Sequence, residues 1–487
     1  MRATLRRSCD ACAKAKHSCD LRSPRCSRCI RRGVRCNYVN EPLTASAHAP
    51  SPARNVKLLG IKRTPPPTNN NAARTLPSTP VSAASIGGSI GLLAPADAAF
   101  DPFDSYPATR LPRVHVQRLM QHFLSTIAFQ YYPLDLNMES NPFVVAWWPL
   151  ALADPALFHV SIQTASLDEE LRAQRGFPIS ELLMADSVSL VRRKIADSSL
   201  AVQDETMNAV VTLAAIEHGK GNFEASQMHI DGVKRMVDVR GGISQVKRTS
   251  PLTARMVPWV SLLVTGSPQF PVQDDDGFGD GLSPITQWRL APSTTGFGTG
   301  PFSDAAIDHD VAHILSRLRY IFEPLEQPRL TNADLHDLAC FAVHKLLLLP
   351  ETPSGGGAGE SSRPAVSECL RYAMVLYMLV LHGTTYYSHV HLVMAVVQQL
   401  QKQIEALAES PHLHGPLGIW AVSVGMASAA DMDDACAWFM EQGRFLAREL
   451  DLVTWDDVLM QLQSVLWSEG NEPLFRRQWI RLFDTIP

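Results

Sequence analysis

Six of the nine cysteines in this 487-residue chain lie between residues 9 and 36. Their spacing is Cys-x2-Cys-x6-Cys-x6-Cys-x2-Cys-x6-Cys, which is two copies of one unit offset by 17 residues. The six are Cys9, Cys12, Cys19, Cys26, Cys29 and Cys36. A segment this short cannot build an adequate apolar core alone. The array therefore predicts a small module that folds around bound metal.

The ligand count favours two zinc ions. Zinc takes four thiolate or imidazole ligands in closed structural sites, and the six thiolates suffice for two ions if two of them bridge. Three alternatives fit less well. Disulfides would suit a secreted protein. Two separate zinc sites would need eight ligands, and His17 is the only histidine nearby. The spacing is not that of ferredoxin iron–sulfur clusters.

Charge is divided along the chain in the same way as cysteine. Residues 1–40 hold eleven Lys or Arg and two acids, a formal +9, whereas the rest holds 33 basic and 46 acidic residues, a formal −13. Such a basic segment indicates contact with nucleic acid or a membrane surface. We find no apolar signal-peptide core near the start and no apolar run of 18 residues, so we expect an intracellular protein with no membrane contact.

The sequence predicts three regions, 1–40, 41–112 and 113–487. Twelve prolines, with Ala, Ser, Thr and Asn, fill residues 41–112, and we expect this linker to be disordered because it cannot bury enough apolar surface. Residues 113–487 show helical periodicity and no sustained strand alternation, which predicts a large all-α domain.

Several helix ends in this domain are predicted from local signals. Ser180 is expected to cap one helix, Asp204 to open another, and Gly241-Gly242 to end a third. Thr454 with Asp457 three residues later predicts a capping box. Apolar spacing predicts further helices near residues 119–127 and 392–407. Asp274-Asp275-Asp276 is expected in a solvated loop.

The cysteine array resembles the fungal Zn2Cys6 binuclear-cluster DNA-binding domain over residues 6–38. The resemblance includes Cys9-Asp10, Cys19-Asp20 and the loop Ser23-Pro24-Arg25-Cys26. It implies two Zn²⁺ ions, with Cys9 and Cys26 bridging. Cys12 and Cys19 would complete one zinc site, and Cys29 and Cys36 the other.

The resemblance also implies a DNA reader. The family's first short helix enters the major groove and typically reads CGG-type triplets, and Lys16 and His17 stand at the positions that would contact bases. Where the family is strongly basic, this chain has Ala13, Ala15 and Ser18, so half-site preference can differ. The expected phosphate contacts are Arg6, Arg7, Lys14, Arg22, Arg28, Arg31, Arg32 and Arg35.

The whole chain accordingly resembles a nuclear transcription factor of RNA polymerase II genes. The stretch His229–Gly242 is similar to a stretch in the regulatory region of some such factors. The alanine that starts the run after Cys12 and the Arg32-Gly33 pair resemble regulators of secondary-metabolite gene clusters. Expected partners are double-stranded DNA and the transcription machinery. Residues 41–112 show no coiled-coil heptads, so a homodimer would form through the helical domain, and monomeric binding stays open.

Two other functions are weighed against this one. The first is a zinc-stapled scaffold that binds protein or RNA without reading DNA sequence. The second is an enzyme in the helical domain, but no catalytic residues are apparent. His309 and His313 share a helix face as in zinc proteases, yet Asp310 replaces the usual glutamate and no third ligand is evident. Cys340, Cys369 and Cys436 are expected to be ordinary buried thiols. Binding of a small molecule by the helical domain is left undecided.

Overall fold

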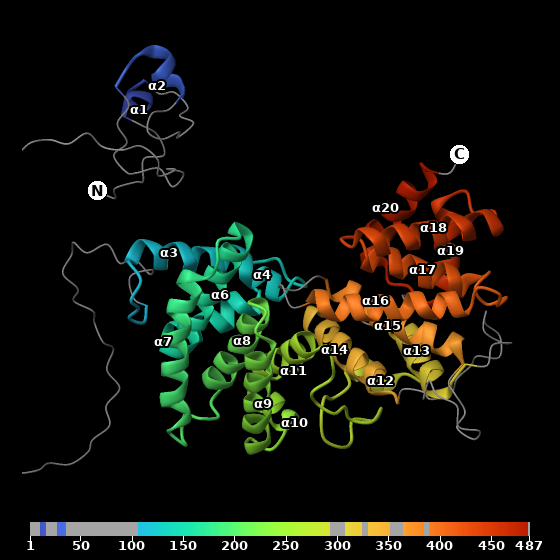
Figure 1. The fold of residues 1–487 in the computed structure, drawn as a ribbon, viewed down its shortest axis with the longest axis horizontal. Coiled ribbons are helices and arrows are strands. Elements are labelled where there is room, and N and C mark those ends of the chain that lie inside the picture. Colours follow the sequence, from blue (N-terminus) through green and yellow to red (C-terminus); the bar gives the residue numbers. More distant parts are fainter. Residues whose placement is uncertain are drawn as a thin grey trace, which may run out of the picture. The chain divides into compact units, whose positions relative to one another are not determined.

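The structure, a computed structural model, divides into two units, Met1–Ala94 and Pro95–Pro487. Each is described by itself (Figure 1). The expected linker lies almost entirely outside the described residues. The structure describes residues 10–15, 27–35, 106–292, 307–323, 330–350, 364–383 and 389–485.

The first unit contains two short helices that contact each other, α1 (Asp10–Lys14) and α2 (Ser27–Arg32). Each begins one residue after the first cysteine of a Cys-x2-Cys pair. The duplicated cysteine spacing is therefore matched by a duplicated helix in the described part of this unit.

The second unit is helical throughout its described residues, apart from one isolated β-bridge between Val272 and Leu282. Successive helices pack side by side as hairpins (Figure 1). Its amino-terminal half contains α3 (Arg113–His122), a π-helical turn (Phe123–Ile127), α4 (Ala128–Tyr131), a second π-helical turn (Phe143–Trp147), α5 (Trp148–Ala153), α6 (Pro155–Ala173), α7 (Pro178–Ile195), α8 (Asp204–Gly219), α9 (Phe223–Val239), α10 (Ile243–Thr249), α11 (Pro251–Thr265) and α12 (Thr286–Leu290). Its carboxyl-terminal half contains α13 (His309–Phe322), α14 (Asn332–Leu348), α15 (Ala365–His382), α16 (His389–Ala406), α17 (Pro416–Ser428), α18 (Asp433–Glu449), α19 (Trp455–Val465), a 3-10 turn (Glu469–Asn471) and α20 (Glu472–Phe483).

The central helices are buried on every side. All residues of α17 from Leu417 to Ala427 are buried, and α8 and α15 are nearly as enclosed. Outer helices bury one stripe only, as in α9, where Ile230, Val233 and Val237 recur at three- and four-residue steps. Helices that are apolar all round belong in a core, and those with one apolar stripe belong at its surface.

One described helix, α15, is long and apolar enough to cross a membrane by length and composition. Within its most apolar stretch 83% is buried inside the unit. The same helix carries Glu368 and Arg371, both buried. These features are those of a core helix.

Most helix ends follow the sequence signals. Gly241 and Gly242 have φ of +87° and +90°, and their N–H groups donate to the carbonyls of Asp238 and Val237, which closes α9 as predicted. The capping box of α19 is also confirmed, since the backbone N–H of Thr454 donates to the Asp457 carboxylate at 2.8 Å and the Thr454 hydroxyl accepts from Asp457. The hydroxyl's own hydrogen bond to the carboxylate holds the pKa of Asp457 below its usual value.

Ser180 does not cap its helix. The helix begins two residues earlier, at Pro178, because proline at the first position needs no N–H partner. The carboxylate of Glu170, from the preceding helix, instead accepts from the N–H groups of Ile179 and Ser180 at 2.8 and 3.2 Å. The cap comes from another helix, and no local signal reveals it.

The prediction for Asp274-Asp275-Asp276 is wrong at its central residue. Asp275 accepts from Trp288 Nε1 at 2.8 Å and pairs with Lys345 Nζ at 2.9 Å. Burial opposes ionisation of Asp275, but these partners hold the pKa of its carboxyl below the usual value. Asp275 Oδ2 also lies 3.3 Å from His313 Nδ1, while His313 Nε2 accepts from Arg317, so both nitrogens of that histidine have partners within the fold.

Two of the three isolated cysteines are buried as expected. Cys340 and Cys369 are 5% and 0% exposed, and burial raises the pKa of both thiols, to about 12 for Cys369. Cys436 is only partly buried. The segment 451–475, which mixes acids with aromatic residues, is packed into the unit through Trp455, Leu462 and Phe475.

A buried arginine joins α14 to α15. Arg371, 2% exposed, donates from Nε to the carbonyl of Leu346 at 2.8 Å and from Nη2 to that of Leu349 at 3.0 Å. Its Nη1 pairs with Glu368 at 3.2 Å. Arg371 thus satisfies carbonyl groups at the end of α14 that have no partner within their own helix.

We expect Arg371→Met to lower the free energy of unfolding by about 3–5 kcal/mol, because it removes one member of a buried ion pair and the donor for the carbonyl groups of Leu346 and Leu349. Arg444→Met is the control, since Arg444 pairs with the exposed Glu441 at 2.8 Å and such surface pairs contribute about 0–1 kcal/mol. Urea unfolding followed by helical circular dichroism measures both. Equal shifts for the two variants would contradict the role given to Arg371.

Candidate metal centre and nucleic-acid interface

Two cysteines are the buried residues in the described part of the first unit. Cys12 is the third residue of α1 and Cys29 the third residue of α2, and they are 2% and 1% exposed. Around them Ile30 and Val34 are exposed. In these described helices the sulfur-bearing residues, and not the larger apolar ones, point inward. That is the arrangement expected where thiolates hold a metal at the centre of a small module.

The end of α2 is fixed by a glycine. Gly33 has φ of +63°, its N–H donates to the carbonyl of Ile30, and the N–H of Val34 donates to that of Cys29 at 3.1 Å. This hydrogen-bond pattern is a Schellman motif, which requires a left-handed residue. It turns the chain away from the helix before the sixth cysteine.

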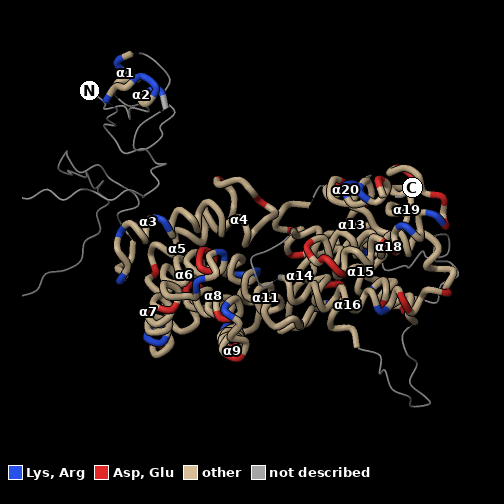
Figure 2. Tube along the Cα trace, turned by 45° about the horizontal axis from the view of Figure 1, so that its top comes forward, with Lys and Arg blue, Asp and Glu red and all other residues tan. Residues whose placement is uncertain are grey.

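Positive charge surrounds the buried thiols. Lys14, Arg31, Arg32 and Arg35 are exposed, and Figure 2 shows Lys and Arg on both short helices. Arg28, beside Cys29, is half-buried, and its Nε has no hydrogen-bond partner among the described residues. Cations close in sequence to cysteines favour the thiolate form. The buried sulfurs and the cations around them together fit an anionic zinc–thiolate cluster.

The structure places part of the predicted site. Among the phosphate-contact candidates, Lys14, Arg28, Arg31, Arg32 and Arg35 are described, and Cys12 and Cys29 are described among the ligands. The others lie outside the described residues, so within the described chain no group of three potential ligands forms. Those outside are Arg6, Arg7, Cys9, Lys16, His17, Cys19, Arg22, Cys26 and Cys36.

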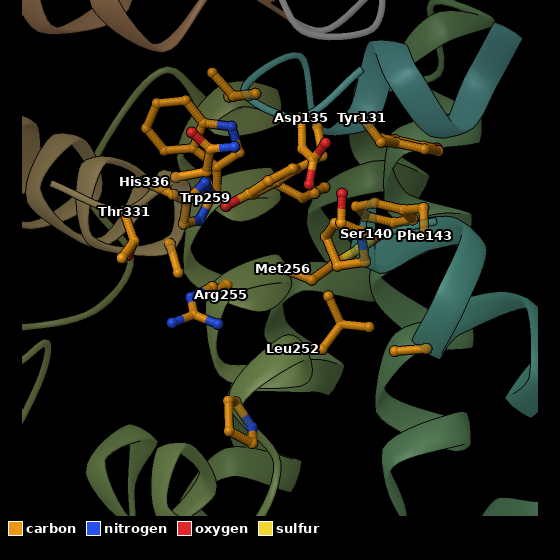
Figure 3. Close-up of a pocket in the computed structure, with 18 of the residues that line it drawn as sticks. Tyr131, Asp135, Ser140, Phe143, Leu252, Arg255, Met256, Trp259, Thr331 and His336 are labelled. Atoms are coloured by element: carbon orange, nitrogen blue, oxygen red, sulfur yellow. The ribbon is translucent and has the colours of Figure 1, made fainter. Parts of the chain in front are cut away.

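Sequence analysis missed a pocket in the second unit. It has a volume of about 500 Å³ and is lined by α4 and the loop after it, the second π-helical turn, α8, α11 and the start of α14. Figure 3 shows His336 on one side of it and Ser140 and Phe143 on the other. The lining residues come from segments far apart in the chain, and no local motif marks them.

Two regions of the chain match known families. Residues 7–46 match the fungal Zn(2)-Cys(6) binuclear cluster domain, and residues 118–267 match the fungal specific transcription factor domain. Over these two regions the chain carries the domains of the fungal Zn2Cys6 transcription factors. The first match spans α1 and α2, and the second spans the helices from α3 to α11.

Similar curated proteins are fungal regulators. The Zn(2)-C6 fungal-type transcription factor aoiH of Aspergillus oryzae is 56% identical over 34 residues, 7% of this chain and 9% of that protein. The aflatoxin biosynthesis regulatory protein of Aspergillus flavus is 45% identical over 49 residues, 10% of this chain and 11% of that protein. The transcription factor pgmR of Aspergillus terreus is 34% identical over 113 residues, 22% of this chain and 56% of that protein. This chain therefore spans about a tenth of the length of the first two and about half of the third. No solved structure matches.

These matches confirm the broad assignment made from the cysteine array. A Zn(2)-Cys(6) cluster domain binds two zinc ions, and the matched domains are those of a DNA-binding transcription regulator and not of an enzyme. The all-α description of the second unit is likewise confirmed for its described residues. The stretch His229–Gly242 lies in α9 and its end, inside the second matched region.

Zinc removal should unfold the zinc-binding module and leave the second unit intact, because the buried side chains in the module's described helices are the cysteines Cys12 and Cys29 and not an apolar core. We expect Cys26→Ser to lower zinc content below two ions per chain and to expose residues 1–40 to protease. Cys436→Ser, outside the array, is the matched control and should retain both ions. Metal analysis and limited proteolysis of the full chain measure these effects. Full zinc content and protection in Cys26→Ser would rule out the assigned ligand set.

Proposed function

We propose that this chain is a nuclear, sequence-specific DNA-binding regulator of RNA polymerase II genes that reads CGG-type sites through its zinc cluster. The observation that carries the proposal is the pairing of buried thiols with exposed cations. Cys12 and Cys29 are buried, while Lys14, Arg31 and Arg32 on the same two helices are exposed. A module whose interior is metal-binding and whose surface is cationic suits contact with a polyanion.

In this proposal all six cysteines of the array bind the two zinc ions, with Cys9 and Cys26 bridging. The ions supply the cross-links that fix the two helices, and the chain's own residues make every contact with DNA. The formal charge of residues 1–40 is consistent with both roles. The segment carries +9, and it stays positive after six thiolates and two zinc dications are counted.

Base reading is assigned to Lys16 and His17. They follow the described end of α1 at Lys14 by two and three residues. Lysine donors match the O6 and N7 acceptors that guanine presents in the major groove. The eight cationic residues Arg6, Arg7, Lys14, Arg22, Arg28, Arg31, Arg32 and Arg35 are assigned to phosphates, which position the module without reading sequence.

The regulated genes are proposed to belong to a secondary-metabolite cluster. Support comes from the similarity of the amino-terminal region to an aflatoxin biosynthesis regulatory protein and from the Arg32-Gly33 pair. The boundaries we propose are a DNA-binding module at 1–40, a linker at 41–112 and a regulatory domain at 113–487. That last region would carry contacts with the transcription machinery and any homodimer contact.

Lys16→Ala should remove the preference for CGG. We expect the full chain to bind a duplex containing CGG more tightly than one with the triplet scrambled, and Lys16→Ala to reduce that ratio by about tenfold, since one good base contact contributes about 1–3 kcal/mol of discrimination. Fluorescence anisotropy with labelled duplexes measures both affinities.

Lys402→Ala is the control for that experiment, because Lys402 is exposed on α16. It should leave both affinities unchanged. Equal binding of the two duplexes by the unsubstituted chain would refute sequence reading and favour a zinc-stapled scaffold.

Affinity for DNA should fall steeply with salt. Each phosphate neutralised contributes roughly −0.9 to the slope of log affinity against log salt concentration. We expect Arg31→Ala to make the slope shallower by about one unit on any duplex sequence, because it removes one phosphate contact. Lys402→Ala again serves as the control. A slope that Arg31→Ala leaves unchanged would contradict the assignment of Arg31.

A further inference from the structure

The pocket of the second unit has the features of a small-molecule site. Its volume of about 500 Å³ lies within the range of ligand pockets in proteins, roughly 300–1,000 Å³. Aromatic rings and aliphatic side chains make most of its wall. They include Tyr131, Phe143, Leu252, Met256, Trp259 and Leu263 (Figure 3).

One buried polar atom on this wall lacks a partner. Trp259 is 3% exposed, and its Nε1 has no hydrogen-bond partner among the described residues. Leaving a buried polar group without a partner costs about 1–3 kcal/mol. His336 Nδ1 lies 2.9 Å from His382 Nε2, and the ring of Trp259 packs on His382 with centroids 4.4 Å apart. These contacts fix both rings in place.

The charges at the pocket nearly cancel. Arg255 donates from Nε and Nη2 to the carboxylate of Asp337 at 2.8 and 3.2 Å, and Lys247 lies 3.0 Å from the same carboxylate. Asp135 also lines the pocket.

Two further titratable groups of the wall, His336 and Tyr132, are uncharged near pH 7. Burial lowers the pKa of His336 to about 4 and raises that of Tyr132 to about 12. A wall with one cation already paired, one carboxylate and neutral rings does not select a charged ligand. It selects one whose polar groups are hydrogen-bond acceptors, because the indole N–H of Trp259 can only donate.

We propose that this pocket binds a neutral, ring-containing small molecule whose carbonyl or hydroxyl oxygen accepts a hydrogen bond from Trp259. The rings of Tyr131 and Phe143, whose centroids are 5.1 Å apart, supply a flat apolar wall for it. The site belongs to the second unit alone and goes beyond the proposed DNA-binding function.

The test uses the full chain and 6-propionyl-2-(dimethylamino)naphthalene, a neutral fluorescent ketone whose emission shifts to the blue in apolar surroundings. We expect saturable one-to-one binding with a blue shift. Trp259→Phe keeps an aromatic ring and removes the donor, so affinity for the ketone should fall about 5- to 10-fold. Affinity for 2-(dimethylamino)naphthalene, which has no carbonyl group, should stay the same.

Filling the pocket provides a second test. Ala333 and Ala146 line it from α14 and from the second π-helical turn. Ala333→Phe and Ala146→Phe should each weaken both probes by about tenfold or more, since a close-packed ring leaves no room for them. Ala437→Phe, at an exposed position of α18, is the matched control and should have no effect. Thermal unfolding verifies that each variant is folded.

Several outcomes would overturn the proposal. They are non-saturable binding, no binding to the full chain because another segment fills the pocket, unchanged binding in folded Ala333→Phe and Ala146→Phe, or equal loss of both probes in Trp259→Phe. Failure here is distinct from failure of the DNA-binding proposal, because Lys16→Ala should leave probe binding unchanged.

Discussion

The guanidinium of Arg371 closes the end of α14 from within α15, and the helical unit depends on this join. Through α14 the arginine reaches α11 and α13, and through its own helix it reaches α16 and α17. The carbonyl groups of Leu346 and Leu349 accept hydrogen bonds from a donor that α15 supplies. A hydrogen bond to a charged group is stronger than a neutral one, so the contact fixes the register of the two helices as well as their proximity. The wall that α14 gives to the pocket is held in place in the same way.

The two units are stabilised by different interactions. In the second unit, several helices are enclosed by others, and apolar burial supplies the driving force. In the first unit the described helices are five and six residues long, too short to be stable alone in water. Metal–thiolate bonds take the place of an apolar core there. In the described part of this unit the cationic side chains of Lys14, Arg31, Arg32 and Arg35 are therefore free to lie at the surface.

The sequence predicted structural features most accurately where the signal lies in a few neighbouring residues. The cysteine spacing identified the metal module, Gly241 and the Thr454–Asp457 pair marked helix ends, and the stripe from Leu392 to Leu407 gave α16. Enclosed helices such as α17 carry no stripe, so periodicity could not position them. Ser180 and Asp275 were misjudged because their partners, Glu170 and Lys345, belong to other helices. The pocket was invisible for the same reason, since Tyr131, Trp259 and His336 meet only after the chain has folded.

The enclosure of α15 and α17 has a consequence for shortened forms of the protein. The neighbours of α17 include α18, α19 and α20, which later parts of the chain supply, and α17 in turn covers α15. A premature stop codon between α17 and α20 would therefore remove cover from α17 and expose its apolar side chains to solvent, where such surfaces promote aggregation. We expect chains shortened in this way to be lost to aggregation or degradation.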